Sequence, residues 1–276
     1  MASRTFRSIL AHTGALNGTG AAAPVTYARR LGLFSATMAV MGGIIGGGIF
    51  RTPAVVAERT GTVELALLAW ALGGAVALAG AFCYAELGER RPFAGGSYIY
   101  LRDAFGPLPA FLYGWAELLV IQSGGTAAVA LTFASYAGAL AGLPHSAELP
   151  IAIGAIVLLA GVNYVGVGTA AITGNVATVL KLVAIALLVA VCLRLPASAG
   201  SVAATTTPVQ TPPGPAVLLL GAALVPVLFT YGGWQQTNMI AEEIRDAPRT
   251  LPRALLLGVV GVIVVYLLAN ISYARA

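Results

Sequence analysis

Two apolar stretches of this 276-residue chain carry clusters of glycine near their middle: Met41-Gly-Gly-Ile-Ile-Gly-Gly-Gly-Ile-Phe50 and Phe229-Thr-Tyr-Gly-Gly-Trp234. Glycine costs about 1 kcal/mol relative to alanine inside a helix, and a helix opened within lipid leaves N–H and C=O groups without water. Such breaks persist at membrane depth only where they line a cavity enclosed by protein, and there the backbone groups bind ligands. The clusters therefore predict a binding site built from main-chain atoms.

The polarity of the two breaks predicts the ligand. Gly46, Gly47 and Gly48 would begin an outer half-helix whose N–H groups, at a dipole end of about half a positive charge, suit a carboxylate. The half-helix ending near Phe229 and Thr230 would leave carbonyl oxygens that suit an ammonium group. The two together describe a receptor for a zwitterion. The alternative is that the glycines only permit close helix packing; breaks in two corresponding spans favour the site.

Two charged residues lie inside apolar stretches, where a charge is costly and must face the protein interior, find a partner or lose its proton. Lys181 is a candidate proton carrier or a fixed cation in place of a metal ion. A purely structural lysine, bonded to carbonyls of the broken first span, is an equally open interpretation. For Glu117 a packing or gating role is favoured. The aromatic residues around the second break, Trp234 among them, either pack or gate a cavity.

The elements that must position these residues are transmembrane helices. The chain is 58% hydrophobic and 9% charged, with a mean hydropathy of +0.88. Apolar segments close to or above the ~20 residues that cross a bilayer, with no alternation of period two, predict an all-α polytopic membrane protein. We expect seven spans, at 31–54, 63–86, 108–138, 149–165, 172–194, 216–240 and 254–273.

Arginine placement predicts that the N-terminus is cytoplasmic, in a multi-pass protein of the cell membrane. Ten arginines fall on one side of the spans and four on the other. The first group is Arg4, Arg7, Arg29, Arg30, Arg90, Arg91, Arg102, Arg245, Arg249 and Arg253, and the second is Arg51, Arg59, Arg194 and Arg275. Topology thus accounts for the net charge of +5, and no nucleic-acid partner is expected.

The glycine breaks also predict the domain organisation. Both occupy the first span of a five-span unit, so residues 31–195 would form one repeat and residues 216–276 the beginning of a second, inverted one. Residues 1–30 read as a cytoplasmic tail, with an organellar transit peptide as the less favoured alternative. The stretch 196–215 reads as an irregular outer linker. We expect the chain to be the N-terminal part of a longer carrier.

Other function classes fit less well. Cys83 and Cys192 both fall inside spans, which supports neither a disulfide nor a metal site. No cluster of His, Cys and Asp has metal-ligand spacing, so neither an enzyme nor a cofactor is expected. A seven-span receptor remains the alternative, but its usual orientation conflicts with the arginine distribution and it gives no reason for two broken helices.

The motifs together resemble the amino acid–polyamine–organocation superfamily, nearest to L-type amino acid transporters and related bacterial permeases. The matching segments are Ile44-Ile-Gly-Gly-Gly-Ile-Phe50, Cys83-Tyr-Ala-Glu-Leu-Gly88, Gly95-Gly-Ser-Tyr98, Lys181, Phe229-Thr-Tyr-Gly-Gly-Trp234, Glu242-Glu-Ile244 and Leu251-Pro-Arg253. The resemblance implies a LeuT-type inverted-repeat fold of twelve spans, of which this chain would hold about seven, with spans one and six broken.

The resemblance also implies roles for individual residues in sodium-independent transport by alternating access, as a proton symporter or an exchanger. Lys181 would occupy the place of a sodium ion, and a neutral amino acid is favoured because no acidic residue lies at the breaks. No residue between 142 and 149 matches the cysteine that joins animal relatives to a heavy chain, so no disulfide-linked partner is expected. The implied substrate site consists of Ile44, Ile45, Gly46, Gly47 and Gly48 for the carboxylate, Phe229, Thr230 and Gly232 for the amine, and the adjacent Trp234.

Overall fold

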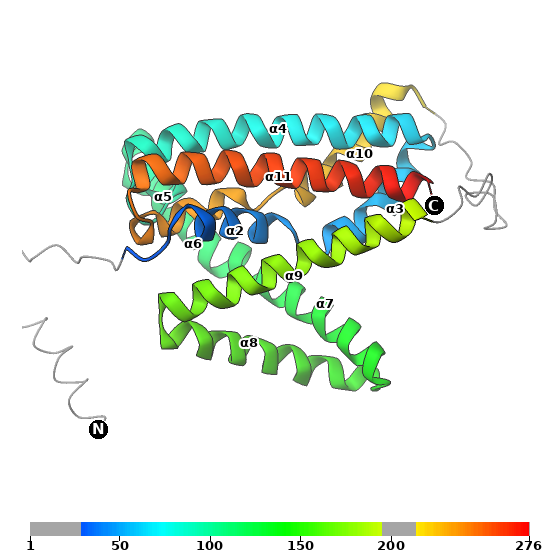
Figure 1. The fold of residues 1–276 in the computed structure, drawn as a ribbon. Coiled ribbons are helices and arrows are strands. Elements are labelled where there is room, and N and C mark those ends of the chain that lie inside the picture. The colour runs from blue at the N-terminus through cyan, green and yellow to red at the C-terminus, as the bar shows by residue number, and fades with distance from the viewer. Residues whose placement is uncertain (1–28, 195–213, 276) are drawn as a thin grey trace, which may run out of the picture.

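The computed structural model describes residues 29–194 and 214–275, which are almost entirely helical (Figure 1). The expected tail at 1–30 and linker at 196–215 lie outside these residues, except at their ends. The α-helices are α2 (Leu33–Ile44), α3 (Gly48–Thr60), α4 (Val63–Arg90), α5 (Ser97–Phe105), α6 (Pro107–Ala116), α7 (Ser123–Ala141), α8 (Glu148–Val165), α9 (Val167–Arg194), α10 (Ala216–Thr230) and α11 (Ala247–Arg275). Between them lie the π-helix η1 (Glu117–Gln122) and the 3-10 helices η2 (His145–Ala147) and η4 (Trp234–Glu243).

Among the described residues, six helical segments are long and apolar enough to cross a membrane, and the bent pair α2 and α3 makes a seventh. This confirms the predicted all-α polytopic class. Three boundaries were wrong by five residues or more: the first span ends at Thr60 rather than 54, the fifth begins at Val167 rather than 172, and the seventh at Ala247 rather than 254. The seventh helix starts in polar sequence, and Pro248 is tolerated in its first turn because the N–H that proline lacks would have no partner within the helix there.

Helices α4 and α11 lie side by side along most of their length (Figure 1), and α2 packs against α11. Small residues make this close approach possible, as in other membrane helix contacts. The buried face of α4 consists almost wholly of alanine and glycine, at Ala69, Gly73, Gly74, Ala77, Ala81, Ala85 and Gly88, with Trp70 as the one large side chain.

Helices α7 and α8 form a second layer below the α4–α11 layer in Figure 1. They pack on each other through Ala130, Ala134 and Ala152. Helix α9 runs between the two layers and contacts α2, α8 and α11. A polar residue on α9 is therefore in position to reach the first broken span.

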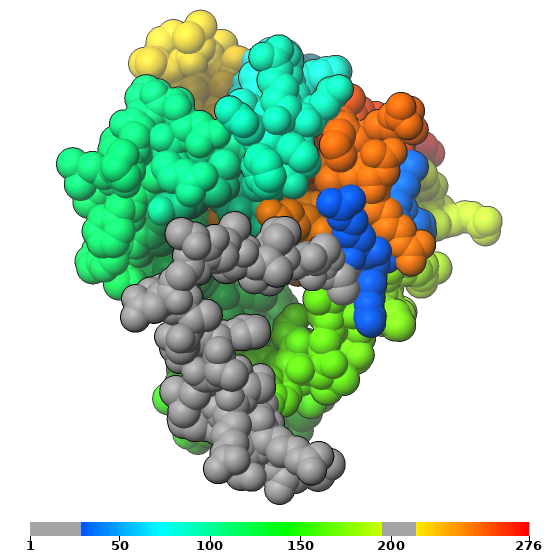
Figure 2. Space-filling model, turned by 90° about the vertical axis from the view of Figure 1, so that its left-hand side faces the viewer, coloured from blue at the N-terminus to red at the C-terminus, as the bar shows by residue number. Residues whose placement is uncertain are grey.

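The chain entering α2 is held against the end of η4 by main-chain hydrogen bonds. The Leu31 amide donates to the Glu243 carbonyl at 3.0 Å, and the Arg245 amide donates to the Leu31 carbonyl at 2.8 Å. Figure 2 faces this end of the molecule and shows the blue start of the described chain against orange atoms of the later segment. Helices α2 and η4, each one half of a broken span, are thus linked at the ends that lie away from the breaks.

Candidate functional site

The first and sixth spans are both broken at the glycine clusters, as predicted. Helix α2 ends at Ile44 and α3 begins at Gly48, and their axes differ by 43°. Helix α10 ends at Thr230, and the chain turns through Gly233, at φ +112°, before η4 begins. Gly48 is therefore the first helical residue after one break, and Thr230 is the last before the other.

The two breaks are in direct contact. A Cβ atom at Gly233 would overlap the carbonyl oxygen of Gly43 and lie 2.8 Å from its carbonyl carbon. A Cβ at Gly48 would lie 2.8 Å from the Cγ2 atom of Thr230. Real Cβ atoms do not approach other atoms this closely, so glycine at these two positions lets the broken helices meet.

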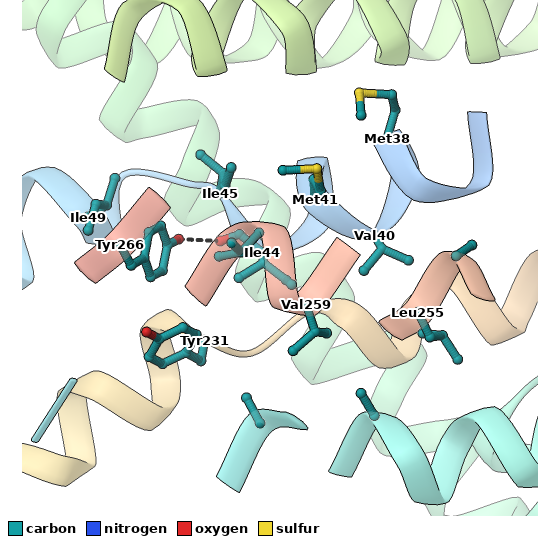
Figure 3. Close-up of a cluster of buried hydrophobic side chains, with 14 of the residues drawn as sticks. Met38, Val40, Met41, Ile44, Ile45, Ile49, Tyr231, Leu255, Val259 and Tyr266 are labelled. Atoms are coloured by element: carbon teal, nitrogen blue, oxygen red, sulfur yellow. Dashed lines mark hydrogen bonds between the residues drawn. The ribbon is translucent and has the colours of Figure 1, made fainter. Parts of the chain in front are cut away.

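Donors from two other helices bind the carbonyl groups that the end of α2 exposes. The Lys181 Nζ atom donates to the Ile45 carbonyl at 2.9 Å and to the Gly42 carbonyl at 3.4 Å. The Tyr266 hydroxyl donates to the Ile44 carbonyl at 3.1 Å, drawn as a dashed line in Figure 3. A helix C-terminus carries about half a negative charge, so the Lys181 ammonium also complements the helix dipole.

Tyr266 is a site residue that the sequence analysis missed. Its hydroxyl also lies 3.5 Å from the Thr230 carbonyl, so one side chain reaches the last carbonyl of each broken half-helix. Its ring packs with Trp70 and Tyr231, at centroid distances of 5.6 and 5.1 Å. A buried tyrosine usually has a hydrogen-bond partner for its hydroxyl. This tendency was the only feature of the sequence that could have indicated Tyr266 as a site residue.

The aromatic residues around the second break have different surroundings. The Phe229 side chain is 89% exposed, whereas Tyr231 is 1% exposed within the aromatic cluster. The Trp234 ring lies 5.1 Å from that of Tyr84, and a Cβ at Gly80 would lie 2.7 Å from its Cζ2 atom. Tyr231 and Trp234 therefore pack against α4, and Phe229 remains available to other partners.

The start of α3 has the features of an anion site. No side chain caps the helix, because glycine occupies the cap position at Gly47. Among the described residues, nothing lies within 4 Å of a Cβ placed at Gly46, and only the Thr132 methyl, at 3.8 Å, approaches one at Gly47. Uncapped N–H groups at a helix N-terminus beside open space favour a negatively charged group.

A cavity of about 570 Å³ lies beside the first break, between α2, α9 and η4. Its lining includes Gly42 and Lys181 and the polar residues Asn175 and Glu243. Its lining includes none of the residues Gly46–Gly48 or Phe229–Trp234, so this cavity is separate from the site predicted at the two breaks.

Helix η4, the half of the sixth span after the break, is held by α4, by α5 and by the loop between them. The buried Asn238 side-chain amide donates to the Tyr100 hydroxyl at 2.8 Å and to the Tyr84 carbonyl at 3.1 Å. The Gly95 amide donates to the Met239 carbonyl at 3.2 Å. Burial raises the pKa of Tyr100, which lies outside the spans. These bonds hold η4 in place beyond the break.

Comparison with known proteins places this arrangement in a family. The family model "Amino acid permease" matches residues 31–276. Human b(0,+)-type amino acid transporter 1 is 36% identical over 252 residues, which are 89% of this chain and 51% of the relative. Rat large neutral amino acids transporter small subunit 2 is 36% identical over 259 residues, covering 91% and 48%. Human Asc-type amino acid transporter 1 is 34% identical over 273 residues, covering 93% and 50%.

The chain thus spans about half the length of the curated relatives it matches. The relatives are transporters, which is the class that the glycine breaks and the motifs indicated. The family match begins at residue 31, two residues before α2, and includes both broken spans and Lys181. The resemblance is confirmed, and the chain belongs to the amino acid permease family, within the amino acid–polyamine–organocation superfamily.

Proposed function

We propose that the protein carrying this chain moves neutral amino acids across a membrane by alternating access, independently of sodium. The observation that carries the proposal is the contact of the Lys181 ammonium with the Ile45 and Gly42 carbonyls. In carriers with broken helices, unwound carbonyls and half-helix C-termini are the groups that coordinate a sodium ion. Here the Lys181 ammonium, a cation that is part of the protein, already binds the Gly42 and Ile45 carbonyl oxygens. A sodium ion would have to displace it.

The two breaks supply complementary groups for an amino acid. Of the five residues Ile44–Gly48, Ile44 lies within α2 and the Ile45 amide donates to the Met41 carbonyl, so the three glycines are the carboxylate site. The Thr230 carbonyl keeps a lone pair for the amine, with Phe229 and Gly232 beside it. Phe229 is exposed enough to cover a ligand, and Trp234 shapes the site from the α4 side.

The main experiment compares amino acid uptake into proteoliposomes in sodium and in choline buffers. We expect equal initial rates in the two buffers, and faster uptake of neutral than of cationic amino acids. Counterflow into preloaded vesicles, with and without a proton gradient, distinguishes exchange from proton symport. Strict dependence on sodium would show that Lys181 does not take the place of the ion.

A leucine at Gly47 tests the carboxylate site. The only described atom near a Cβ at this position is the Thr132 methyl at 3.8 Å, so the fold has room for the side chain. A ligand held by the backbone would leave no room for a leucine side chain. We therefore expect uptake to fall at least tenfold at normal expression. Gly221→Leu on α10, where nothing lies within 4 Å, is the matched control. Wild-type uptake by Gly47→Leu would show that this glycine serves packing alone.

We also propose that the N-terminus faces the cytoplasm and that no disulfide joins the chain to a second subunit. One relative is named a small subunit, so association with another chain is a property to test. The two cysteines, Cys83 and Cys192, lie within α4 and α9 and none lies in an outer loop. The protein should migrate identically on reducing and non-reducing gels; a larger species that disappears on reduction would contradict the proposal.

A further inference from the structure

Arg59, near the outer end of α3, binds the main chain of the other broken span. Its Nη1 atom donates to the Ala222 carbonyl of α10 at 2.6 Å. The two helices pack against each other, and Figure 1 shows them at the same end of the molecule. They are the outer halves of spans one and six, so this hydrogen bond joins two segments that are 163 residues apart in sequence.

The Ala222 carbonyl is available because of a proline. In an α-helix this oxygen would accept from the amide four residues later, and that residue is Pro226, which lies inside α10 and has no N–H. An unsatisfied carbonyl in a membrane helix is costly unless a neighbour supplies a donor. The guanidinium group of Arg59 is that donor, and a charged donor makes a stronger hydrogen bond than a neutral one.

A second hydrogen bond joins the same helices at the break. The Thr52 and Thr230 hydroxyl groups lie 2.9 Å apart, and the Thr230 hydroxyl lies 2.8 Å from the Pro226 carbonyl oxygen. Thr52 and Arg59 are about two helical turns apart, and so are Thr230 and Ala222. The antiparallel pair α3 and α10 is therefore joined both at the break and at its outer part.

We infer that Arg59 is a positioning residue that makes α3 and α10 move as one body when the outer side opens and closes. The inference rests on the proposed alternating-access transport, because only that cycle requires the outer half-helices to move. Among the described residues, Arg59 donates its hydrogen bond to Ala222, which is not part of the proposed substrate site. Loss of the link should therefore slow the cycle without changing substrate binding.

The test distinguishes a link between α3 and α10 from a hydrogen bond that only satisfies the Ala222 carbonyl. Arg59→Met removes both, and we expect it to lower the thermal unfolding midpoint. In the double variant Arg59→Met/Pro226→Ala, position 226 regains a backbone amide that can donate to the Ala222 carbonyl. This should restore the midpoint but not the contact between the helices. Arg59→Lys keeps a cation that can reach the carbonyl and is the conservative control.

The link is measured by pulsed EPR in lipid, after Cys83 and Cys192 are replaced by alanine. One label at the exposed Leu140 of α7 is paired with a second at Glu58 of α3 or at Val217 of α10. In the wild type and in Arg59→Lys, both distance distributions should shift together when an amino acid is added. In the double variant only one of the two distance distributions should shift. The kcat for uptake should fall at least tenfold, with KM unchanged.

The outcomes are distinct. A double variant whose two distances still shift together, or whose kcat is that of the wild type, would show that Arg59 only satisfies a carbonyl, and would overturn the inference. An unchanged unfolding midpoint in Arg59→Met would overturn the argument from Pro226. If the wild-type protein bound and transported no amino acid, the proposed function would fail. The link would then be measured with the two labels at Glu58 and Val217, and a distance distribution broader in the double variant than in the wild type would still establish it.

Discussion

Two tyrosines of one buried cluster should respond in opposite ways to the loss of a single oxygen atom. The Tyr266 hydroxyl donates to the Ile44 carbonyl at 3.1 Å and lies 3.5 Å from the Thr230 carbonyl. The Tyr231 hydroxyl is buried, and no described residue offers it a hydrogen-bond partner. Both side chains are at most 1% exposed, and their ring centroids are 5.1 Å apart. Tyr266→Phe and Tyr231→Phe are therefore matched variants.

The expected free-energy changes follow from these contacts. Tyr266→Phe loses a hydrogen bond and leaves the Ile44 carbonyl without this donor, which should lower the free energy of unfolding by about 1–3 kcal/mol. Tyr231→Phe removes a hydroxyl whose burial no partner offsets, so it should be neutral or stabilising by up to about 1 kcal/mol. At roughly 2–4 °C per kcal/mol for a domain of this size, the unfolding midpoint of Tyr266→Phe should lie about 2–16 °C below that of Tyr231→Phe.

The assay is thermal unfolding of the purified variants in detergent, followed by loss of the monodisperse chromatographic peak. Uptake into proteoliposomes is the second measurement, and we expect Tyr266→Phe to be slower than Tyr231→Phe because only Tyr266 holds the ends of both broken half-helices. Equal midpoints, or a Tyr231→Phe variant less stable than Tyr266→Phe, would refute this account of the hydrogen bonds at the breaks.

Further predictions concern the breaks and Lys181. Gly233→Ala should destabilise the protein by about 2–5 kcal/mol, because its Cβ would overlap the Gly43 carbonyl and a non-glycine residue at φ +112° is strained. The control is Gly221→Ala, a position with open space around it. Equal unfolding midpoints for the two variants would contradict the contact between the breaks. Lys181→Ala should reduce uptake roughly 10- to 100-fold, since it removes charge-assisted hydrogen bonds of about 1.5–3 kcal/mol, and normal uptake by this variant would leave Lys181 with no part in coupling.

Much of the architecture could be predicted from local sequence. Apolar segment length and composition indicated the spans, because a bilayer sets the minimum length of a helix that crosses it. The breaks were predicted at the correct positions because glycine is costly inside a helix and the two clusters lie in corresponding spans of the expected repeats. The starts of α9 and α11 were wrong because a hydropathy pattern marks the apolar part of a helix, whereas α11 begins in polar sequence at Ala247.

For Lys181, the sequence determined that a charge inside an apolar span needs a partner, but not which one. The structure decided it: the ammonium lies on the carbonyl groups of the first break, 136 and 139 residues away. The same holds for Tyr266, whose acceptor on Ile44 is 222 residues away, and for Arg59, whose acceptor is 163 residues away.

These contacts share a physical reason for being invisible in the sequence. In each, the acceptor is a main-chain carbonyl, which every residue carries, so the side-chain sequence does not mark it. What frees the carbonyl is local, a glycine break or Pro226, and can be read from the chain. Which distant donor reaches it depends on how the helices pack, and small residues such as those of α4 allow many packing arrangements until the whole bundle selects one.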